Sequence, residues 1–199
     1  MLVARRGEVM VEHYFRERTA DMRFQSWSKS VTSLLLGICI DRGLIASLDD
    51  KAERHAPKLR GTHHGGVSLR HLSNMASGAE ILHASDDYGV LYRRCFTDAD
   101  SDIAALVAGW NKRGEGRAGL AGGQFNYNEL YTLSIGLVIR QVASMSLSEL
   151  AEEALWQKLE ADATWSTDSW STDSTGKEFC CVGFGARLRD WARLGQLGK

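Results

Sequence analysis

One proline and four cysteines stand in a chain of 199 residues, which also lacks an excess of charge of either sign and a long apolar run. The 24 basic and 25 acidic side chains leave a formal net charge of −1. This balance excludes a nucleic-acid-binding protein that works through bulk positive charge, because phosphate binding needs a basic face. The longest apolar run, residues 34–40, is far shorter than the ~20 residues that a membrane-spanning helix needs. We therefore expect no nucleic-acid partner and no membrane partner.

The cysteines do not form the pattern of a disulfide framework or of a redox motif. No two of them have the C-x-x-C spacing, and Cys180 and Cys181 are adjacent. Four cysteines are too few to hold a chain of this length together through disulfides, so we expect reduced thiols. Charged residues also follow the first four residues too early for a secretory signal. Both observations favour a cytoplasmic protein.

Several motifs that identify enzyme classes are absent. The sequence has no G-x-S-x-G elbow, no H-E-x-x-H and no Walker loop. His63, His64 and His71 do not have a familiar zinc spacing, and we expect solvated loop histidines there rather than metal ligands. No metal site is therefore predicted.

The hydrophobic pattern predicts one β-hairpin followed by many helices. Residues 1–15 are typical of two strands joined by a turn. The next helix is expected to be capped by Ser26 or Ser28 and to stop at Gly43; because residues 31–40 are apolar or small on every side, we expect it to be buried all round. Further helices are expected at residues 47–56, 68–75, 104–110, 128–143, 146–155 and 186–197, with loops at 61–66, 80–97 and 111–123.

The segment Ser26-Trp-Ser-Lys29, at the start of the predicted buried helix, carries the clearest candidate chemistry. A serine hydroxyl is a poor nucleophile at neutral pH and needs a base within hydrogen-bonding distance. Residues three apart lie on one face of a helix, so Lys29 can reach Ser26. The positive end of the helix and the apolar surroundings favour the free amine of Lys29, and the Ser26 N–H is a candidate oxyanion donor. The motif alone is equally compatible with a Ser26 that only caps the helix and a Lys29 that is solvated.

Tyr127 adds to this motif. It follows a glycine-rich loop at the start of a predicted helix, and a tyrosine beside an ammonium group can carry a proton between nucleophile and leaving group. The alternative is a tyrosine that packs in the core. A second S-x-x-K, Ser174 to Lys177, does not open a predicted helix, and we assign it no role.

These segments and their order resemble the serine β-lactamase and penicillin-binding-protein family, in particular its branch of class C-like esterases and 6-aminohexanoate-oligomer (nylon oligomer) hydrolases. The resemblance covers nearly the whole chain, with the hairpin ending at residues 12–15, the nucleophile motif at 23–33, and the segments 43–50, 69–78, 100–103, 125–136 and 184–195. It implies an α+β fold, the serine β-lactamase/transpeptidase-like α/β sandwich, with a helical lobe at about residues 46–160.

The resemblance also implies a serine hydrolase that works through an acyl-enzyme. Ser26 takes the place of the acylated nucleophile, Lys29 that of its activating base or proton relay, and Tyr127 that of the tyrosine in the second motif. The implied substrate is a small-molecule ester or amide, such as a carboxylic ester or a 6-aminohexanoate-oligomer-like amide. A β-lactamase or D,D-peptidase-like enzyme is the alternative. Neither a metal nor an organic cofactor is implied, and a homodimer is compatible with the family.

The sequence departs from the family pattern at three places. Residues 121–125 lack the usual proline, Glu129 stands where the family often has asparagine, and no Lys/His-Thr/Ser-Gly motif follows Leu197. We therefore expect residues 1–199 to be a single, C-terminally truncated domain, with the N-terminal hairpin present and the C-terminal sheet strands missing. Two alternatives follow: a non-catalytic fragment or pseudoenzyme that binds an acyl ligand or a partner, and a small helical interaction module in which Ser26 only caps a helix.

Overall fold

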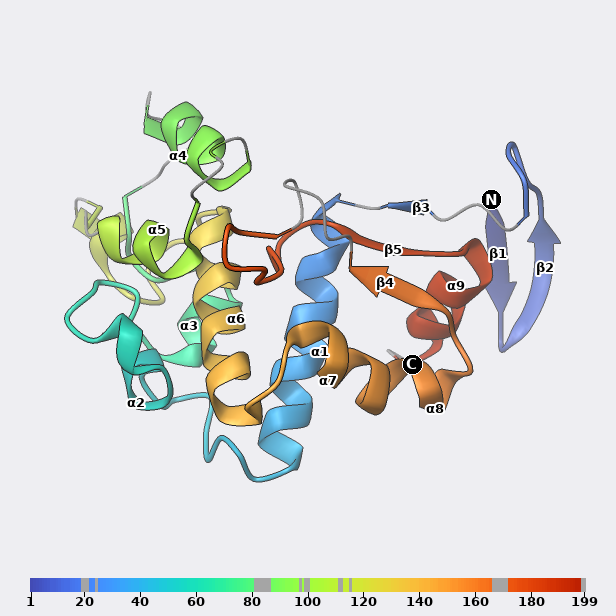
Figure 1. Ribbon diagram of the computed structural model, residues 1–199, viewed down its shortest axis with the longest axis horizontal. Coiled ribbons are helices and arrows are strands. Elements are labelled where there is room, and N and C mark those ends of the chain that lie inside the picture. The colour runs from blue at the N-terminus through green and yellow to red at the C-terminus, as the bar shows by residue number, and fades with distance from the viewer. Residues whose placement is uncertain are drawn as a thin grey trace.

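The computed structural model of the chain describes residues 1–18, 22–23, 25–80, 87–96, 98, 101–110, 113–114, 116–165 and 172–197. Two long helices that pack side by side form its centre, α1 (Ser28–Asp41) and α6 (Glu129–Ala143). Helices α2 to α5 lie on one side of this pair in Figure 1, and the strands lie on the other side with the C-terminal helix α9 (Leu188–Gln196). The combination of helices with short antiparallel strands confirms the predicted α+β class.

The N-terminal hairpin is formed as predicted. β1 (Leu2–Arg5) pairs antiparallel with β2 (Glu8–Glu12), and Gly7 in the turn has a φ of 86°, which glycine adopts without steric cost. β1 packs against α9, and Arg189 in α9 donates two hydrogen bonds of 2.7 Å to the carboxylate of Glu12 at the end of β2. The hairpin forms one end of the molecule in Figure 1.

A second sheet consists of three short strands that the hydrophobic pattern did not predict. β3 (Met22–Arg23) and β4 (Ala163–Trp165) both pair antiparallel with β5 (Phe184–Ala186), so the strand order is β3–β5–β4. Strands of two or three residues are too short to show an alternation of apolar and polar side chains. All three residues of β5 are buried, as expected for the middle strand.

The start of α1 differs from the prediction. Ser26 lies in a 3-10 turn, η1 (Gln25–Trp27), and Trp27 occupies the cap position of α1 without a side-chain capping bond. Neither Ser26 nor Ser28 therefore caps the helix. Ser28 is buried, and its Oγ accepts a hydrogen bond of 3.1 Å from the N–H of Phe184 in β5. This bond fixes the start of α1 to the sheet.

The prediction that α1 is buried on all sides is wrong. Val31 and Leu35 are fully buried, but Ser33, Leu34 and Gly37 are exposed, Leu34 to 37%. The exposed residues recur every three or four positions and therefore share one face of the helix. A segment that is apolar on every side does not tell which face will pack, and α1 packs on α6 and α7 through its other faces.

Two predictions in the helical region need correction. Helices α2 (Ala52–His55), α3 (Leu69–Ser73) and α5 (Ile103–Gly109) lie in the expected segments. However, the helix expected at residues 47–56 begins only at Ala52, because Ser47 Oγ accepts from the N–H of Asp49 in a turn that precedes the helix. Residues 87–96 of the expected loop form helix α4 (Asp87–Phe96). Residues 89, 90 and 92–94 of this helix are exposed. Residues 81–86 and 97 of the expected loop lie outside the described part of the chain.

Helix α6 is buried along most of its length, and this fixes the position of the loop that leads into it. Every residue from Glu129 to Ile139 is buried, and the helix is capped by Asn128, whose Oδ1 accepts from the N–H of Leu130. The chain continues through α7 (Leu147–Ala151), which begins with a capping box of Ser146 and Glu149. A π-helical turn η5 (Glu152–Trp156) and α8 (Gln157–Leu159) follow. Among the described residues no single helix has the length and apolarity to cross a bilayer; α6 and residues 147–159 meet that test only together, as a pair bent by 75°.

Candidate active site

The structure brings Ser26, Lys29 and Tyr127 together, although Tyr127 is 101 residues from Ser26 in the sequence. The Tyr127 hydroxyl donates a hydrogen bond of 2.7 Å to Ser26 Oγ, and Lys29 Nζ donates one of 3.2 Å to the same oxygen. Ser26 is exposed, whereas the Lys29 side chain is only 9% exposed. A solvent-accessible hydroxyl that contacts a phenol and an amine has the geometry that nucleophilic catalysis by serine needs.

Tyr127 is held in place by the two asparagines beside it. Asn126 is buried; its Nδ2 donates to the carbonyl of Glu80 at 3.0 Å and to the Tyr131 hydroxyl at 3.2 Å. Asn128, on the other side, caps α6. Because both neighbours are anchored in the interior, the short loop between them has little freedom, and Tyr127 faces Ser26.

The segment before β5 runs along the first turns of α1 and completes the site from a third direction. Lys29 Nζ donates a hydrogen bond of 3.2 Å to the carbonyl of Cys181, and Thr32 Oγ1 donates one of 2.8 Å to the carbonyl of Cys180. Together with the bond from Phe184 N–H to Ser28 Oγ, these contacts fix Lys29 between the nucleophile and the backbone of residues 180–184. The amine therefore has two defined acceptors, Ser26 Oγ and the Cys181 carbonyl.

The charge state expected for Lys29 is wrong. Burial acts to lower the pKa of Lys29, but the charge interaction with Cys181, the hydrogen bond with Tyr127 and the charge of Glu129 outweigh burial and raise the pKa above its ordinary value. Glu129 Oε1 lies 3.9 Å from Lys29 Nζ. At neutral pH the ammonium form therefore predominates rather than the free amine. The expectation failed because it considered only α1, whereas the opposing groups come from other segments.

Three groups of this site were not among the predicted site residues. They are the carboxylate of Glu129, the carbonyl of Cys181 and the side chain of Asn126. Glu129 had a sequence signal, since it occupies the position two residues after Tyr127 where the family pattern has asparagine. The carbonyl of Cys181 had none, because a main-chain group carries no residue-type signature.

The second S-x-x-K has no such surroundings. Ser174 Oγ donates a hydrogen bond of 2.7 Å to the carbonyl of Ser101, and Lys177 pairs with Asp173, four residues earlier. In these contacts neither Ser174 nor Lys177 binds Ser26, Lys29 or Tyr127. The motif stabilises a turn, and no catalytic role is assigned to it.

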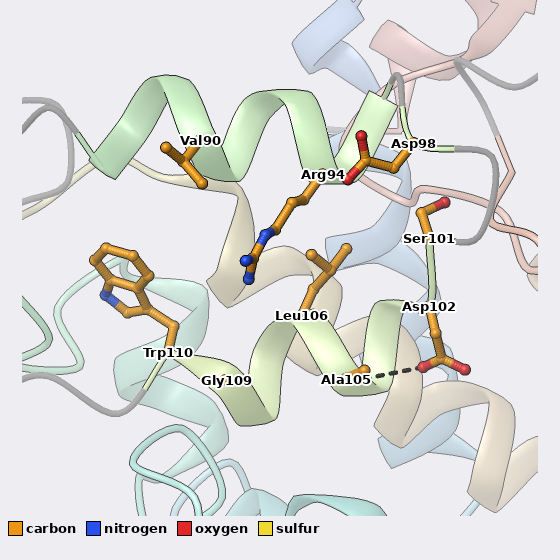
Figure 2. Close-up of a pocket in the computed structure, with 9 residues that line it drawn as sticks. All are labelled: Val90, Arg94, Asp98, Ser101, Asp102, Ala105, Leu106, Gly109 and Trp110. Carbon is orange, nitrogen blue, oxygen red and sulfur yellow. Dashed lines mark hydrogen bonds between the residues drawn. The ribbon is translucent and has the colours of Figure 1, made fainter.

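Two cavities lie among the helices. One, of about 220 Å³, lies beside Lys29 between α1, α3 and α6, and hydroxyl groups of Ser30, Thr32 and Ser33 line it. The other, of about 270 Å³, lies between α4 and α5, and Figure 2 shows the Arg94 side chain pointing into it. None of the three predicted catalytic residues lines the second cavity, so we place the candidate active site at Ser26 and not between α4 and α5.

The prediction of solvated loop histidines is wrong for His64. Its side chain is fully buried, and neither ring nitrogen has a hydrogen-bond partner. Burial, with a smaller effect of the neighbouring His63, lowers the pKa of His64 to about 3, so the ring is neutral. The ring contacts Tyr131, with 5.6 Å between centroids. In the part of the chain that the structure describes, no group of three or more His, Cys, Asp or Glu side chains could hold a metal ion.

Comparison with solved structures establishes the fold. The chain is similar to a proposed 6-aminohexanoate-dimer hydrolase from Bacillus anthracis, with a TM-score of 0.81 and 23% identity over 98% of this chain and 52% of that chain. It is also similar to EstCE1, a hydrolase with promiscuous acyltransferase activity (TM-score 0.72, 18% identity, 97% of this chain and 65% of that chain). A D-stereospecific amidohydrolase from Streptomyces sp. gives a TM-score of 0.70 at 18% identity, over 88% of this chain and 60% of that chain. The fold is thus that of β-lactamases and transpeptidases, and the chain spans between 52% and 65% of the length of these structures.

Comparison with families and with curated proteins gives two further results. No curated protein sequence matches the chain. The family model described as Beta-lactamase matches residues 1–176, which is most of the 199 residues. The order of segments, the fold and this match agree, and the chain belongs to the Beta-lactamase family.

Proposed function

We propose that this protein is a serine hydrolase that attacks an ester or amide carbonyl through Ser26 and forms an acyl-enzyme. The observation that carries the proposal is the pair of hydrogen bonds that Ser26 Oγ accepts, 2.7 Å from the Tyr127 hydroxyl and 3.2 Å from Lys29 Nζ. Ser26 is exposed, so a carbonyl carbon can approach its oxygen. The hydrolases of the same fold support a reaction of this kind.

The proposed reaction has two balanced halves. In the first, a bond forms between Ser26 Oγ and the carbonyl carbon while the Ser26 proton passes to the Lys29 amine, directly or through Tyr127. The same proton then goes to the leaving oxygen or nitrogen as its bond to the carbonyl carbon breaks. In the second half, water attacks the carbonyl carbon of the acyl-enzyme and gives a proton to Lys29, directly or through Tyr127. That proton then goes to Ser26 Oγ as its bond to the carbonyl carbon breaks and the carboxylic acid is released. The Ser26 N–H is the proposed donor to the carbonyl oxygen.

Esters and linear amides are the proposed substrates. Three structural neighbours support this choice: they are described as a proposed 6-aminohexanoate-dimer hydrolase, a hydrolase with promiscuous acyltransferase activity and a D-stereospecific amidohydrolase. A β-lactamase or D,D-peptidase-like activity is the second candidate, and neighbours described as a proposed beta-lactamase from Bacteroides dorei and a penicillin-binding protein from Bacillus halodurans favour it. Matched panels of p-nitrophenyl esters, 6-aminohexanoate dimer and nitrocefin separate the two candidates.

An activity probe tests the nucleophile directly. The purified chain is incubated with a fluorophosphonate, which reacts with activated serines, and its intact mass is measured. We expect one adduct on the parent protein and none on Ser26→Ala. Ser30→Ala is the matched control, because Ser30 is an exposed serine one residue beyond Lys29. We expect this control to be labelled like the parent.

Two outcomes contradict the proposal. The absence of an adduct on a folded parent means that Ser26 is not activated, and the function then lies in binding an acyl ligand or a partner. An adduct that persists on Ser26→Ala means that another residue is the nucleophile. Circular dichroism of each variant distinguishes both outcomes from loss of the fold.

The proposal also covers the domain organisation, the location and the oligomeric state of the protein. Residues 1–199 are taken as one partial domain with its helical lobe at about residues 46–160, acting on a small molecule in the cytoplasm. A homodimer remains a prediction, and sedimentation velocity tests it. One structural neighbour is described as an octameric penicillin-binding protein homologue from Pyrococcus abyssi, which is a property of that protein.

A further inference from the structure

Glu129 is a buried carboxylate in the first turn of α6, and it faces the candidate active site. The residue is 8% exposed, and its Oε1 lies 3.9 Å from Lys29 Nζ, whose side chain is also almost fully covered. A buried carboxylate is costly unless a positive charge compensates it. Lys29 is the partner that the structure provides, so the two charges stabilise each other.

Titratable groups from two other segments also face Lys29. From the loop before α6, the Tyr127 ring lies with its centroid 5.0 Å from Nζ and its hydroxyl on Ser26 Oγ. From the segment before β5, Cys181 gives a carbonyl and a side chain whose charge also raises the pKa of Lys29, and burial raises the pKa of the nearby Cys180 thiol to about 12. Glu129 is therefore the carboxylate that faces Lys29 among the described residues that contact it.

We propose that Glu129 is a positioning residue that holds Lys29 as an ammonium ion between Ser26 Oγ and the Cys181 carbonyl, and so sets the pH range in which Ser26 reacts. This inference rests on the proposed function, because it assigns a role to Glu129 in the same reaction. Glu129 does not contact Ser26 in any hydrogen bond of the described residues, and it acts through Lys29.

The consequence is a reaction that favours alkaline pH. Lys29 can accept the Ser26 proton only as a free amine, and each pH unit below its pKa reduces that fraction tenfold. An opposite charge within 4–6 Å changes a pKa by about 1–3 units. Removing the carboxylate therefore lowers the pKa of Lys29 by about 1–3 units, and Ser26 then reacts at a pH closer to neutral.

A titration of Lys29 tests the inference without any need for activity. Protein labelled with ¹³C and ¹⁵N at lysine is titrated from pH 6 to 11 by NMR, and the Lys29 signal is assigned by its loss in Lys29→Arg. We expect Lys29 in the parent to titrate above the solvent-exposed lysines. Glu129→Gln, which keeps the size of the side chain, is expected to lower the midpoint by about 1–3 units. Glu129→Asp, which keeps the charge, is expected to lower it less.

Glu153→Gln is the control, because Glu153 forms an exposed ion pair with Arg42 away from the site. We expect it to leave the Lys29 midpoint unchanged. A parent Lys29 that titrates with the exposed lysines overturns the inference, whatever the variants do. A midpoint that is equal in the parent and in folded Glu129→Gln overturns it as well.

The rate of fluorophosphonate labelling then separates this inference from the proposed function. Between pH 7 and 9 we expect the labelling rate of the parent to rise by about 100-fold, and that of Glu129→Gln to rise less steeply and from a higher value at pH 7. A purely structural role of Glu129 would lower the rate by the same factor at every pH. If neither protein is labelled, the proposed function fails, while the Lys29 titration still decides whether Glu129 controls the charge.

Discussion

His64 should make the stability of this protein depend on pH. The folded protein holds its ring neutral, with a pKa of about 3, whereas the unfolded chain has the ordinary value of 6.5. Between these two values the unfolded chain binds a proton on His64 that the folded protein does not bind. The free energy of unfolding therefore decreases as the pH falls below about 6.5 and continues to decrease toward pH 3.

The size of this effect follows from the change in pKa. A decrease of about 3.5 units corresponds to at most about 5 kcal/mol, since one unit is worth about 1.4 kcal/mol. Because pH 5 lies about 1.5 units below the pKa of the unfolded chain, we expect the free energy of unfolding at pH 5 to be about 2 kcal/mol lower than at pH 7.5. For a domain of this size the loss lowers Tm by about 4–8 °C.

Thermal unfolding followed by circular dichroism at pH 7.5, 6.5, 5.5 and 5.0 measures the effect. This range stays above the region in which carboxylates with lowered pKa values, such as Glu178, take up protons. His64→Phe removes the titrating group, and we expect it to flatten the dependence of Tm on pH, whatever its effect at pH 7.5. His13→Gln, a change at an exposed histidine, is expected to keep the dependence. Equal slopes in the parent and in His64→Phe would refute the reasoning.

Three further predictions concern the site and the core. Tyr127→Phe removes the hydroxyl that donates to the nucleophile, and we expect it to slow fluorophosphonate labelling by about 10²–10⁴-fold with an unchanged Tm; an unchanged rate would mean that Tyr127 only packs. Glu178→Gln leaves the guanidinium of Arg140 partly buried without its carboxylate, and urea unfolding should show a loss of about 3–5 kcal/mol; a loss below 1 kcal/mol would contradict this. Gly136→Ala places a Cβ 2.5 Å from Cys180 Sγ, and we expect a loss of about 1–3 kcal/mol that Cys180→Ala partly restores; no restoration would assign the loss to another contact.

The sequence was sufficient for features that depend on neighbouring residues. The helix starts at Ser68, Asp102 and Asn128 were predictable, because a capping side chain binds a backbone N–H only two or three residues away. The same holds for the capping box of Ser146 and Glu149. The hairpin was equally local. The S-x-x-K spacing likewise required only that Ser26 and Lys29 lie one turn apart.

Features that depend on distant residues were not predictable from patterns. The charge of Lys29 depends on Cys181, Tyr127 and Glu129, which come from other segments of the chain, and not on the helix terminus that the sequence suggested. His64 was expected in solvent because its neighbours are glycines and polar residues, yet it packs against Tyr131. β5 is too short to carry a pattern, and its middle position follows from pairing with strands at both ends of the chain.

The three contacts at Lys29 and Ser26 also order events during synthesis of the protein. Tyr127 follows Ser26 by 101 residues, and the carbonyl of Cys181 follows Lys29 by 152 residues. At a translation rate of ~5–20 residues per second, roughly 8–30 s pass between the emergence of the amine and that of its acceptor. A nascent chain therefore carries the serine long before it can be activated. Reactivity at Ser26 would thus appear only when residues 180–184 dock against α1, and a serine probe would report that docking.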